Sequence, residues 1–320
     1  MLYKILKFPA RLAFYLYIRH ISINNKEVFD YDGPLIIASN HPNSFLDAII
    51  YSTLFNKPVH SLARGDVFKK PFYRKLLHGL NMLPVYRVSE GVENLESNYE
   101  TFEDCKDIFR KNGIVLIFSE GGCVNEWHLR PLKKGTARLA VSSWDDNIPL
   151  RILPAALNYS SFHVFGKNIK LNFGKIINRD QIISEGEGIR FIDFNRQLSS
   201  ELEPLVIEIP DRNTAKIRTH FYRHQSIIKK ILLAIPAALG YLLHLPLYLP
   251  AKHYTKKMGG SKLDHYDSIL AGMLFLSYPF YLLLMTLLAY FFFQNAYAFF
   301  ILGVMPFCAW AYIQLKKQLD

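Results

Sequence analysis

The sequence predicts an α/β domain followed by a helical membrane region. Between about residues 28 and 180, short apolar runs alternate with helix-like segments, which is typical of the α/β class. The composition then changes, because residues 231–250 and 268–315 contain no Asp, Glu, Lys or Arg. A chain of 320 residues is long enough for one substantial domain with such an appendage.

The first 24 residues are predicted to form an amphipathic helix at the membrane interface. Lys4, Lys7 and Arg11 interrupt the apolar run, and no small-residue cleavage site follows, so the segment does not resemble a signal peptide. A helix packed on the domain itself is the alternative.

The predicted domain, residues 25–228, begins its regular structure with a buried strand. Its strand candidates are residues 34–39, 82–87, 114–119 and 151–157. Its helix candidates are residues 44–54, 72–80, 98–111 and 135–143. Residues 181–230 are polar and are expected to close the domain.

Residues 229–320 form the predicted membrane region. Segments of about 268–293 and 296–315 are each long enough for a helix that crosses ~30 Å of hydrocarbon. A single crossing by residues 231–250 would place Lys229 and Lys252 on opposite sides, which the positive-inside bias disfavours. We therefore expect a proline-broken, re-entrant hairpin there, and the α/β domain on the cytosolic face. The three scattered cysteines fit a reducing, cytosolic environment.

The formal net charge of +11 suits nucleic acid, anionic lipid or phosphorylated substrates. Membrane partners are favoured because the basic residues flank apolar runs, and no nucleic-acid recognition motif is present. No metal site is predicted, since the histidines lack ligand spacing. Ser119 lacks the preceding glycine of a serine hydrolase elbow.

The segment SNHPNSFLDA, residues 39–48, carries the most informative side chains. Pro42 biases His41 away from helical geometry, so His41 is expected at the end of a strand. Asn43 or Ser44 can cap the following helix, whose first turns contain Asp47. A carboxylate beside an imidazole fixes its tautomer and stabilises the imidazolium, which suits general-base activation of a hydroxyl.

Four motifs in order resemble the glycerolipid acyltransferases of the PlsC type. NHPNSFLD resembles the first motif, and the stretch from Ala63 to Arg87 resembles the approach to the second. IFSEGG resembles the third, with LKKGTARLA as its usual sequel, and RILPAALNY resembles the fourth. The resemblance covers roughly residues 30–180 and extends, through the hydrophobic tail, to a branch with C-terminal membrane segments. It implies a mixed sheet flanked by helices, of the glycerol-3-phosphate acyltransferase-like type.

The resemblance also implies the roles of individual residues. His41 would deprotonate the acceptor hydroxyl and Asp47 would orient His41, with no acyl-enzyme. The implied substrate-binding residues are Arg87 for the acceptor phosphate, Glu120 and Gly121 for the acceptor's hydroxyls, Arg64, Lys133 and Lys134 for the phosphates of acceptor or donor, and Ser44. The acyl donor would be acyl-CoA or acyl carrier protein, with no bound cofactor, and the acceptor lysophosphatidate or glycerol-3-phosphate in phospholipid biosynthesis.

Two departures from the family pattern leave alternatives open. Five residues separate His41 from Asp47, whereas the commonest family form has four. In the third motif Gly122 and Cys123 stand where the family often has Thr-Arg, so the usual phosphate-binding arginine is missing. A different lipid acceptor, such as an amino-acid-derived lipid, and a non-catalytic module that binds anionic lipid are the alternatives.

Overall fold

A seven-stranded mixed sheet forms the centre of the α/β domain, in the order β1-β7-β6-β2-β5-β3-β4. The structure, a computed structural model, describes residues 2–86, 97–259 and 263–319. The strand pairs are parallel except for β6 with β7. The strands are β1 (Ile18–Ile23), β2 (Leu35–Ser39), β3 (Val59–Arg64), β4 (Met82–Val85), β5 (Ile114–Phe118), β6 (Arg151–Tyr159) and β7 (Lys167–Phe173). The predicted mixed sheet flanked by helices is confirmed.

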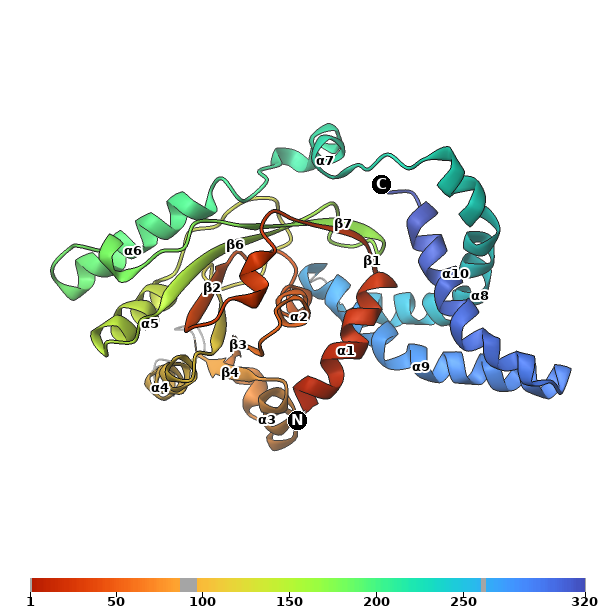
Figure 1. Cartoon of the computed structure of the whole chain (residues 1–320), viewed down its shortest axis with the longest axis horizontal. Helices are drawn as coiled ribbons and strands as arrows, with labels where there is room; N and C mark the ends of the chain where they lie inside the picture. The colour runs from red at the N-terminus through yellow and green to blue at the C-terminus, as the bar shows by residue number, and fades with distance from the viewer. Residues whose placement is uncertain (1, 87–96, 260–262, 320) are drawn as a thin grey trace.

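Helices cover both faces of the sheet (Figure 1). Side chains alternate across a strand, so Ile36 of β2 packs in one core and Ile37 in the other. The Ile36 side holds α4 (Ser97–Arg110), α5 (Lys134–Asp145) and α6 (Glu187–Leu202). The Ile37 side holds α2 (Phe45–Leu54) and parts of the C-terminal helices. The domain also contains α3 (Pro71–Gly79) and α7 (Thr214–Phe221).

The N-terminal helix α1 (Leu2–Tyr15) is shorter than predicted. Residues 18–23, which we expected to be helical, form strand β1 along β7. Three isoleucines in six residues favour a strand at this edge, because β-branched side chains pack well on a pleated surface.

Helix α1 packs on the domain and also presents an apolar face. The Tyr3 hydroxyl donates a hydrogen bond to the Ser52 carbonyl (3.0 Å) and Lys7 donates to the Phe55 carbonyl, which ties α1 to α2. Ile5, Phe8, Leu12 and Tyr15 are exposed at a spacing that places them on one side of α1. The two alternatives for this segment therefore coexist in one helix, and its contact with a membrane stays a prediction.

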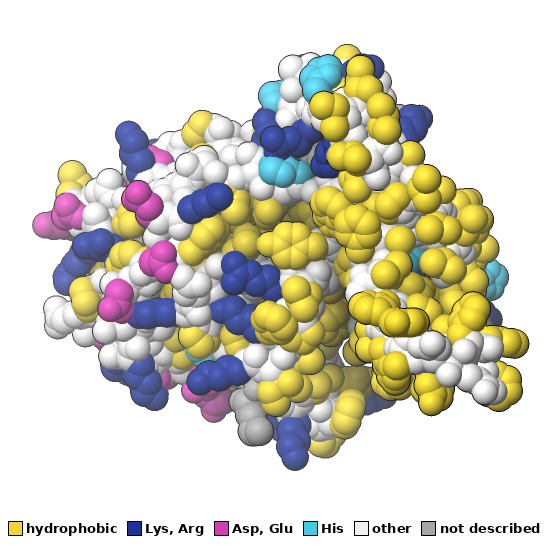
Figure 2. Space-filling model, turned by 45° about the vertical axis from the view of Figure 1, so that its right-hand side comes forward, with side chains coloured by type: hydrophobic (Ala, Val, Ile, Leu, Met, Phe, Trp, Pro, Cys, Tyr) yellow, Lys and Arg dark blue, Asp and Glu magenta, His cyan; other side chains and the backbone are white. Residues whose placement is uncertain are grey.

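Three C-terminal helices carry most of the exposed apolar surface. They are α8 (Ile227–Gly259), α9 (Tyr266–Phe293) and α10 (Ile301–Leu315). Figure 2 shows hydrophobic side chains gathered over this part of the molecule, whereas charged side chains cover the α/β domain. Among the described residues, three helical segments are long and apolar enough to cross a membrane: 227–258, 266–293 and 296–315.

Helix α8 differs from the predicted hairpin, because it is a single helix with no reversing turn. Pro236, Pro246 and Pro250 lie inside it, and Figure 1 shows that it bends along its length. Proline removes one backbone hydrogen bond and clashes with the preceding turn, which kinks a helix without reversing it. The expected proline break is therefore a bend.

Both ends of α8 are nevertheless linked to the α/β domain. At the start, Lys229 donates a hydrogen bond to the Gln314 side chain (2.8 Å), and Gln314 donates to the carbonyl of Arg19 in β1 (3.3 Å). Beyond the end of α8, the Asp264 carboxylate accepts a hydrogen bond from the backbone N–H of Asn125 (3.1 Å). The start of α8 is thus linked to the α/β domain through α10, and the segment after its end is linked to that domain directly.

Gly240 allows the backbones of α8 and α10 to touch. A Cβ atom built at Gly240 would lie 2.0 Å from the carbonyl oxygen of Cys308, so any larger residue must push the helices apart. We expect Gly240→Ala to destabilise the protein by about 1–3 kcal/mol, the usual cost of overpacking, and to lower the melting temperature in detergent.

Gly303→Ala is the matched control on α10. Among the residues that the structure describes, none places an atom within 4 Å of the Cβ position at Gly303, and alanine favours a helix. This variant should melt at or slightly above the wild-type temperature. Equal melting temperatures for the two variants would contradict the close packing of α8 on α10.

Candidate active site

The carboxyl ends of β2, β5 and β6 meet at one edge of the sheet. Ser39, the last residue of β2, is in register with Phe118 of β5 and Ala155 of β6. His41 follows β2 and Glu120 follows β5, so both emerge at this edge. In open α/β sheets such an edge is where ligands bind.

His41 and Asp47 are in direct contact. The Nδ1 atom of His41 lies 2.9 Å from Oδ2 of Asp47. Asp47 is the third residue of α2, and its side chain is fully buried. The side chain of His41 is 16% exposed. The predicted approach of the carboxylate to the imidazole is therefore present, and it fixes the neutral tautomer with the proton on Nδ1.

Two further donors hold the Asp47 carboxylate. The backbone N–H of Asn43 donates to Oδ2 (2.8 Å), and the Tyr159 hydroxyl donates to Oδ1 (2.5 Å). Burial, followed by the charge of Asp47, raises the pKa of Tyr159 well above its usual value, so Tyr159 stays a donor. The carboxylate consequently has one orientation, with Oδ2 facing His41.

The His41 ring is also held by stacking. Its centroid lies 3.8 Å from that of Phe118, with 9° between the ring planes. Nε2, on the side of the ring opposite Asp47, has no hydrogen-bond partner within the described residues. Nε2 is thus the atom available to accept a proton from a bound molecule.

Glu120 braces the backbone of this site. Its carboxylate accepts hydrogen bonds from the backbone N–H groups of His41 (3.0 Å) and Arg130 (3.1 Å), and its side chain is buried. Burial raises the pKa of Glu120, although the two hydrogen bonds oppose that shift. Its sequence-based role, contact with acceptor hydroxyls, stays a prediction.

Ser44 accommodates, through its backbone conformation, the additional residue between His41 and Asp47. Its backbone has φ 52° and ψ −137°, a conformation that non-glycine residues rarely adopt. The Ser44 N–H donates to Sγ of Cys123 (2.9 Å), and its hydroxyl lies 2.7 Å from Nδ1 of His265. This kink lets α2 begin at Phe45 and still present Asp47 to His41.

The comparison with protein families bears on the whole of this edge. Residues 20–158 match the family described as Acyltransferase, a range that runs from within β1 almost to the end of β6 and includes the contact between His41 and Asp47. The chain carries a domain of the acyltransferase family. The resemblance seen in the four sequence motifs is confirmed at this level.

The other comparisons cover shorter parts of the chain or show lower similarity to it. Mitochondrial aconitate hydratases match over short segments: that of Emericella nidulans is 30% identical over 70 residues, and that of Saccharomyces cerevisiae 31% over 74. These segments make up 22% and 23% of this chain, and only 9% and 10% of the enzymes. The crystal structure of the 1-acyl-sn-glycerophosphate (LPA) acyltransferase PlsC from Thermotoga maritima has 15% identity and a TM-score of 0.44, covering 66% of this chain and 80% of that one.

The basic residues proposed for phosphate binding are distributed around the acyltransferase domain. Arg64 ends β3 at the same edge as His41 and pairs with Asp66 (2.5 Å). Lys133 and Lys134 are exposed at the start of α5. Gly121 has φ +68°, and a Cβ atom there would lie 2.8 Å from Cγ of Lys133. Glycine at this position therefore leaves room for the Lys133 side chain to lie against the third motif. Arg87 lies outside the described residues.

Sequence reasoning missed the roles of Tyr159 and Cys123. Tyr159 ends the fourth motif in a run of residues that are all buried in β6, and this apolar run gave no sign of a polar partner. Burial and the nearby Asp47 charge raise the pKa of the Cys123 thiol, which favours the neutral form. Cys123 therefore supports the loop as a neutral acceptor for Ser44.

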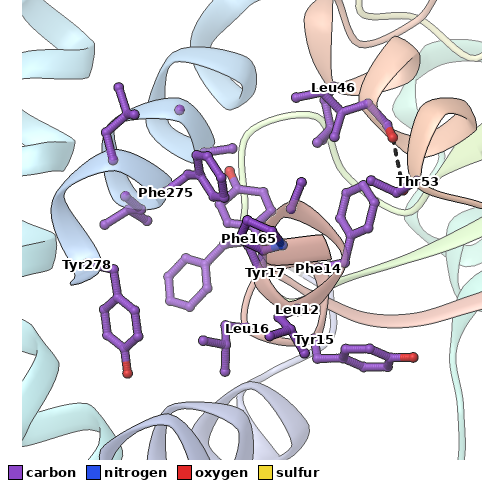
Figure 3. A pocket seen from close by; sticks show the side chains of 18 of the residues that line it. Leu12, Phe14, Tyr15, Leu16, Tyr17, Leu46, Thr53, Phe165, Phe275 and Tyr278 are labelled. Carbon is purple, nitrogen blue, oxygen red and sulfur yellow. Dashed lines mark hydrogen bonds between the residues drawn. The ribbon is translucent and has the colours of Figure 1, made fainter. Parts of the chain in front are cut away.

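A large apolar cavity of about 1280 Å³ lies between the acyltransferase domain and the C-terminal helices. Figure 3 shows Phe14 and Tyr17 near α1, Leu46 on α2 and Phe275 on α9 around one space. Phe45 and Leu46, which precede Asp47, line the cavity. The same loop thus faces both an apolar space and the polar pair.

Proposed function

We propose that this chain is a membrane-bound O-acyltransferase of phospholipid biosynthesis. It transfers a fatty acyl group from acyl-CoA or acyl carrier protein to a hydroxyl of lysophosphatidate or glycerol-3-phosphate. The observation that carries the proposal is the contact of His41 with fully buried Asp47 at the carboxyl edge of an acyltransferase-family domain.

The geometry supports a direct transfer. Nε2 of His41 accepts the proton of the acceptor hydroxyl while Asp47 stabilises the resulting imidazolium. The oxygen attacks the thioester carbonyl, the tetrahedral intermediate collapses, and the carbon–sulfur bond breaks. The imidazolium then returns its proton to the leaving thiolate, so that an ester and a thiol are formed.

The surroundings of the pair suit substrates with one apolar and one anionic end. The apolar cavity beside Phe45 and Leu46 is large enough for a fatty acyl chain. Arg64, Lys133 and Lys134 would supply charge-assisted hydrogen bonds to phosphate groups, as would Arg87.

The docking of the tail supports a cytosolic domain with two crossing helices. Gln314 of α10 links the start of α8 to the acyltransferase domain, whereas Asp264, beyond the end of α8, and Ser268 of α9 bond to that domain directly. Because α8 bends, both of its ends can lie on the side of the domain, and α9 and α10 form the crossing pair. All basic clusters then lie on one side, in agreement with the positive-inside bias.

The test measures thiol release by the purified protein in detergent, with acyl-CoA and acyl carrier protein as donors. We expect release to require lysophosphatidate or glycerol-3-phosphate and to yield the acylated acceptor by mass spectrometry. Thiol release that is independent of every acceptor would contradict the proposal.

A different lipid acceptor is the second candidate, and one observation favours it. Cys123 occupies the third-motif position where the family often has a phosphate-binding arginine, and its sulfur instead accepts the N–H of Ser44. A panel of phosphorylated and amino-acid-derived acceptors distinguishes the two. Turnover only with acceptors that lack a phosphate would favour the second candidate.

A further inference from the structure

The first turn of helix α9 lies directly on the loop between His41 and Asp47. The side-chain amide of Asn125 donates a hydrogen bond to the Pro42 carbonyl (2.7 Å), and its backbone N–H donates one to the Asp264 carboxylate (3.1 Å), so the segment before α9 is held beside the motif. Residues 265, 267 and 268 then make hydrogen bonds to the loop itself. A helix that is apolar enough to cross a membrane is thus part of the wall of the active site.

The side chain at the N-cap position of helix α2 does not cap the helix. Ser44 occupies the N-cap position, but its side chain accepts no backbone hydrogen bond from the helix. Its strained backbone turns the hydroxyl to His265 instead. The free N–H groups at the start of a buried helix need a partner.

Ser268 of α9 supplies that partner. Its hydroxyl accepts a hydrogen bond from the N–H of Leu46 (3.0 Å) and donates one to the carbonyl of Asn43 (3.1 Å). One side chain therefore bridges the two sides of the kink at Ser44. Leu46 immediately precedes Asp47, so this bridge sets the direction from which the carboxylate approaches His41.

Asp267 fastens the same turn to the domain. Its carboxylate accepts hydrogen bonds from the Asn43 amide (2.6 Å), the Lys167 ammonium and the Tyr17 hydroxyl, and all four side chains are buried. A buried carboxylate with a buried cation as its partner has a strict geometric requirement, because either charge alone is costly. The position of Ser268 over α2 is therefore fixed.

We propose that Ser268, held in place by Asp267, is a positioning residue that caps α2 from the membrane helix and sets the contact between His41 and Asp47. The inference rests on the proposed acyl transfer and deepens it. It assigns to α9 a role in the geometry of the reaction as well as in anchoring the chain.

Ser268→Ala in the full chain tests this directly, with Ser268→Thr as the variant that keeps the hydroxyl. We expect Ser268→Ala to lower kcat on the order of tenfold, as misplaced catalytic groups do, with KM for donor and acceptor unchanged. Ser268→Thr should restore most of kcat. Ser277→Ala is the matched control, because the Ser277 hydroxyl donates its hydrogen bond within α9, to the Met273 carbonyl.

The outcomes separate the two proposals. A wild-type protein that transfers acyl groups to no hydroxyl overturns the proposed function and this inference with it. An active wild type with an equally active Ser268→Ala variant overturns the inference alone. So does a loss that appears in KM, or that Ser268→Thr fails to restore, because a merely structural role predicts it. Melting temperatures of all variants are measured in the same detergent.

Discussion

His41→Ala lowers the rate of acyl transfer by on the order of 10² to 10⁴, the range that general-base catalysis contributes. Nε2 of His41 is the proton acceptor at the carboxyl edge, and alanine removes the imidazole that stacks on Phe118. KM for the donor should change little, since the imidazole acts on the acceptor hydroxyl. The rate is measured by thiol release with saturating donor and acceptor.

A second histidine variant controls for nonspecific effects. His220→Ala removes an exposed histidine of α7 that contributes nothing to the pair. This variant should retain the wild-type rate. Full activity in His41→Ala would show that another group removes the proton.

Asp47→Asn lowers kcat by a similar factor, on the order of 10² to 10⁴. Asparagine keeps the size of the side chain, and its oxygen can still accept from His41 and from the N–H of Asn43. Its amide would meet the Tyr159 hydroxyl in place of Oδ1. The charge that stabilises the imidazolium is lost, so the effect should fall on kcat.

The control for Asp47→Asn is Asp32→Asn, which removes an exposed carboxylate paired with Lys57. Rates and melting temperatures of both variants are compared with wild type. An Asp47→Asn protein that melts as wild type and keeps its rate would contradict the assigned role of the carboxylate.

The sequence predicted those parts of the fold that depend on short, continuous segments of the chain. Residues 34–39, 114–119 and 151–157 are continuous apolar runs, as expected of strands buried on both faces, and they are β2, β5 and β6. Strand β7 escaped prediction because it begins with Lys167 and alternates with polar residues. Lys167 can be buried only because Asp267, 100 positions away, pairs with it.

The candidate site divides in the same way. His41 and Asp47 were predicted together because a strand end and a helix start bring them close within a few residues. Tyr159 and Asp267 reach the motif only through the sheet and the docking of α9, and local patterns carry no trace of those contacts. The predicted hairpin over residues 231–250 was wrong, because α8 is one helix that its prolines bend, without the reversing turn that a hairpin requires.

The interdependence of His41 and Asp47 is the central claim, and a double-mutant comparison measures it. Transfer of a radiolabelled acyl group is determined for wild type, His41→Ala, Asp47→Asn and the variant with both changes. If Asp47 acts through His41, the double variant is about as slow as His41→Ala alone, as for residues that work as a unit. A double variant slower than His41→Ala by the full factor of Asp47→Asn would contradict the account.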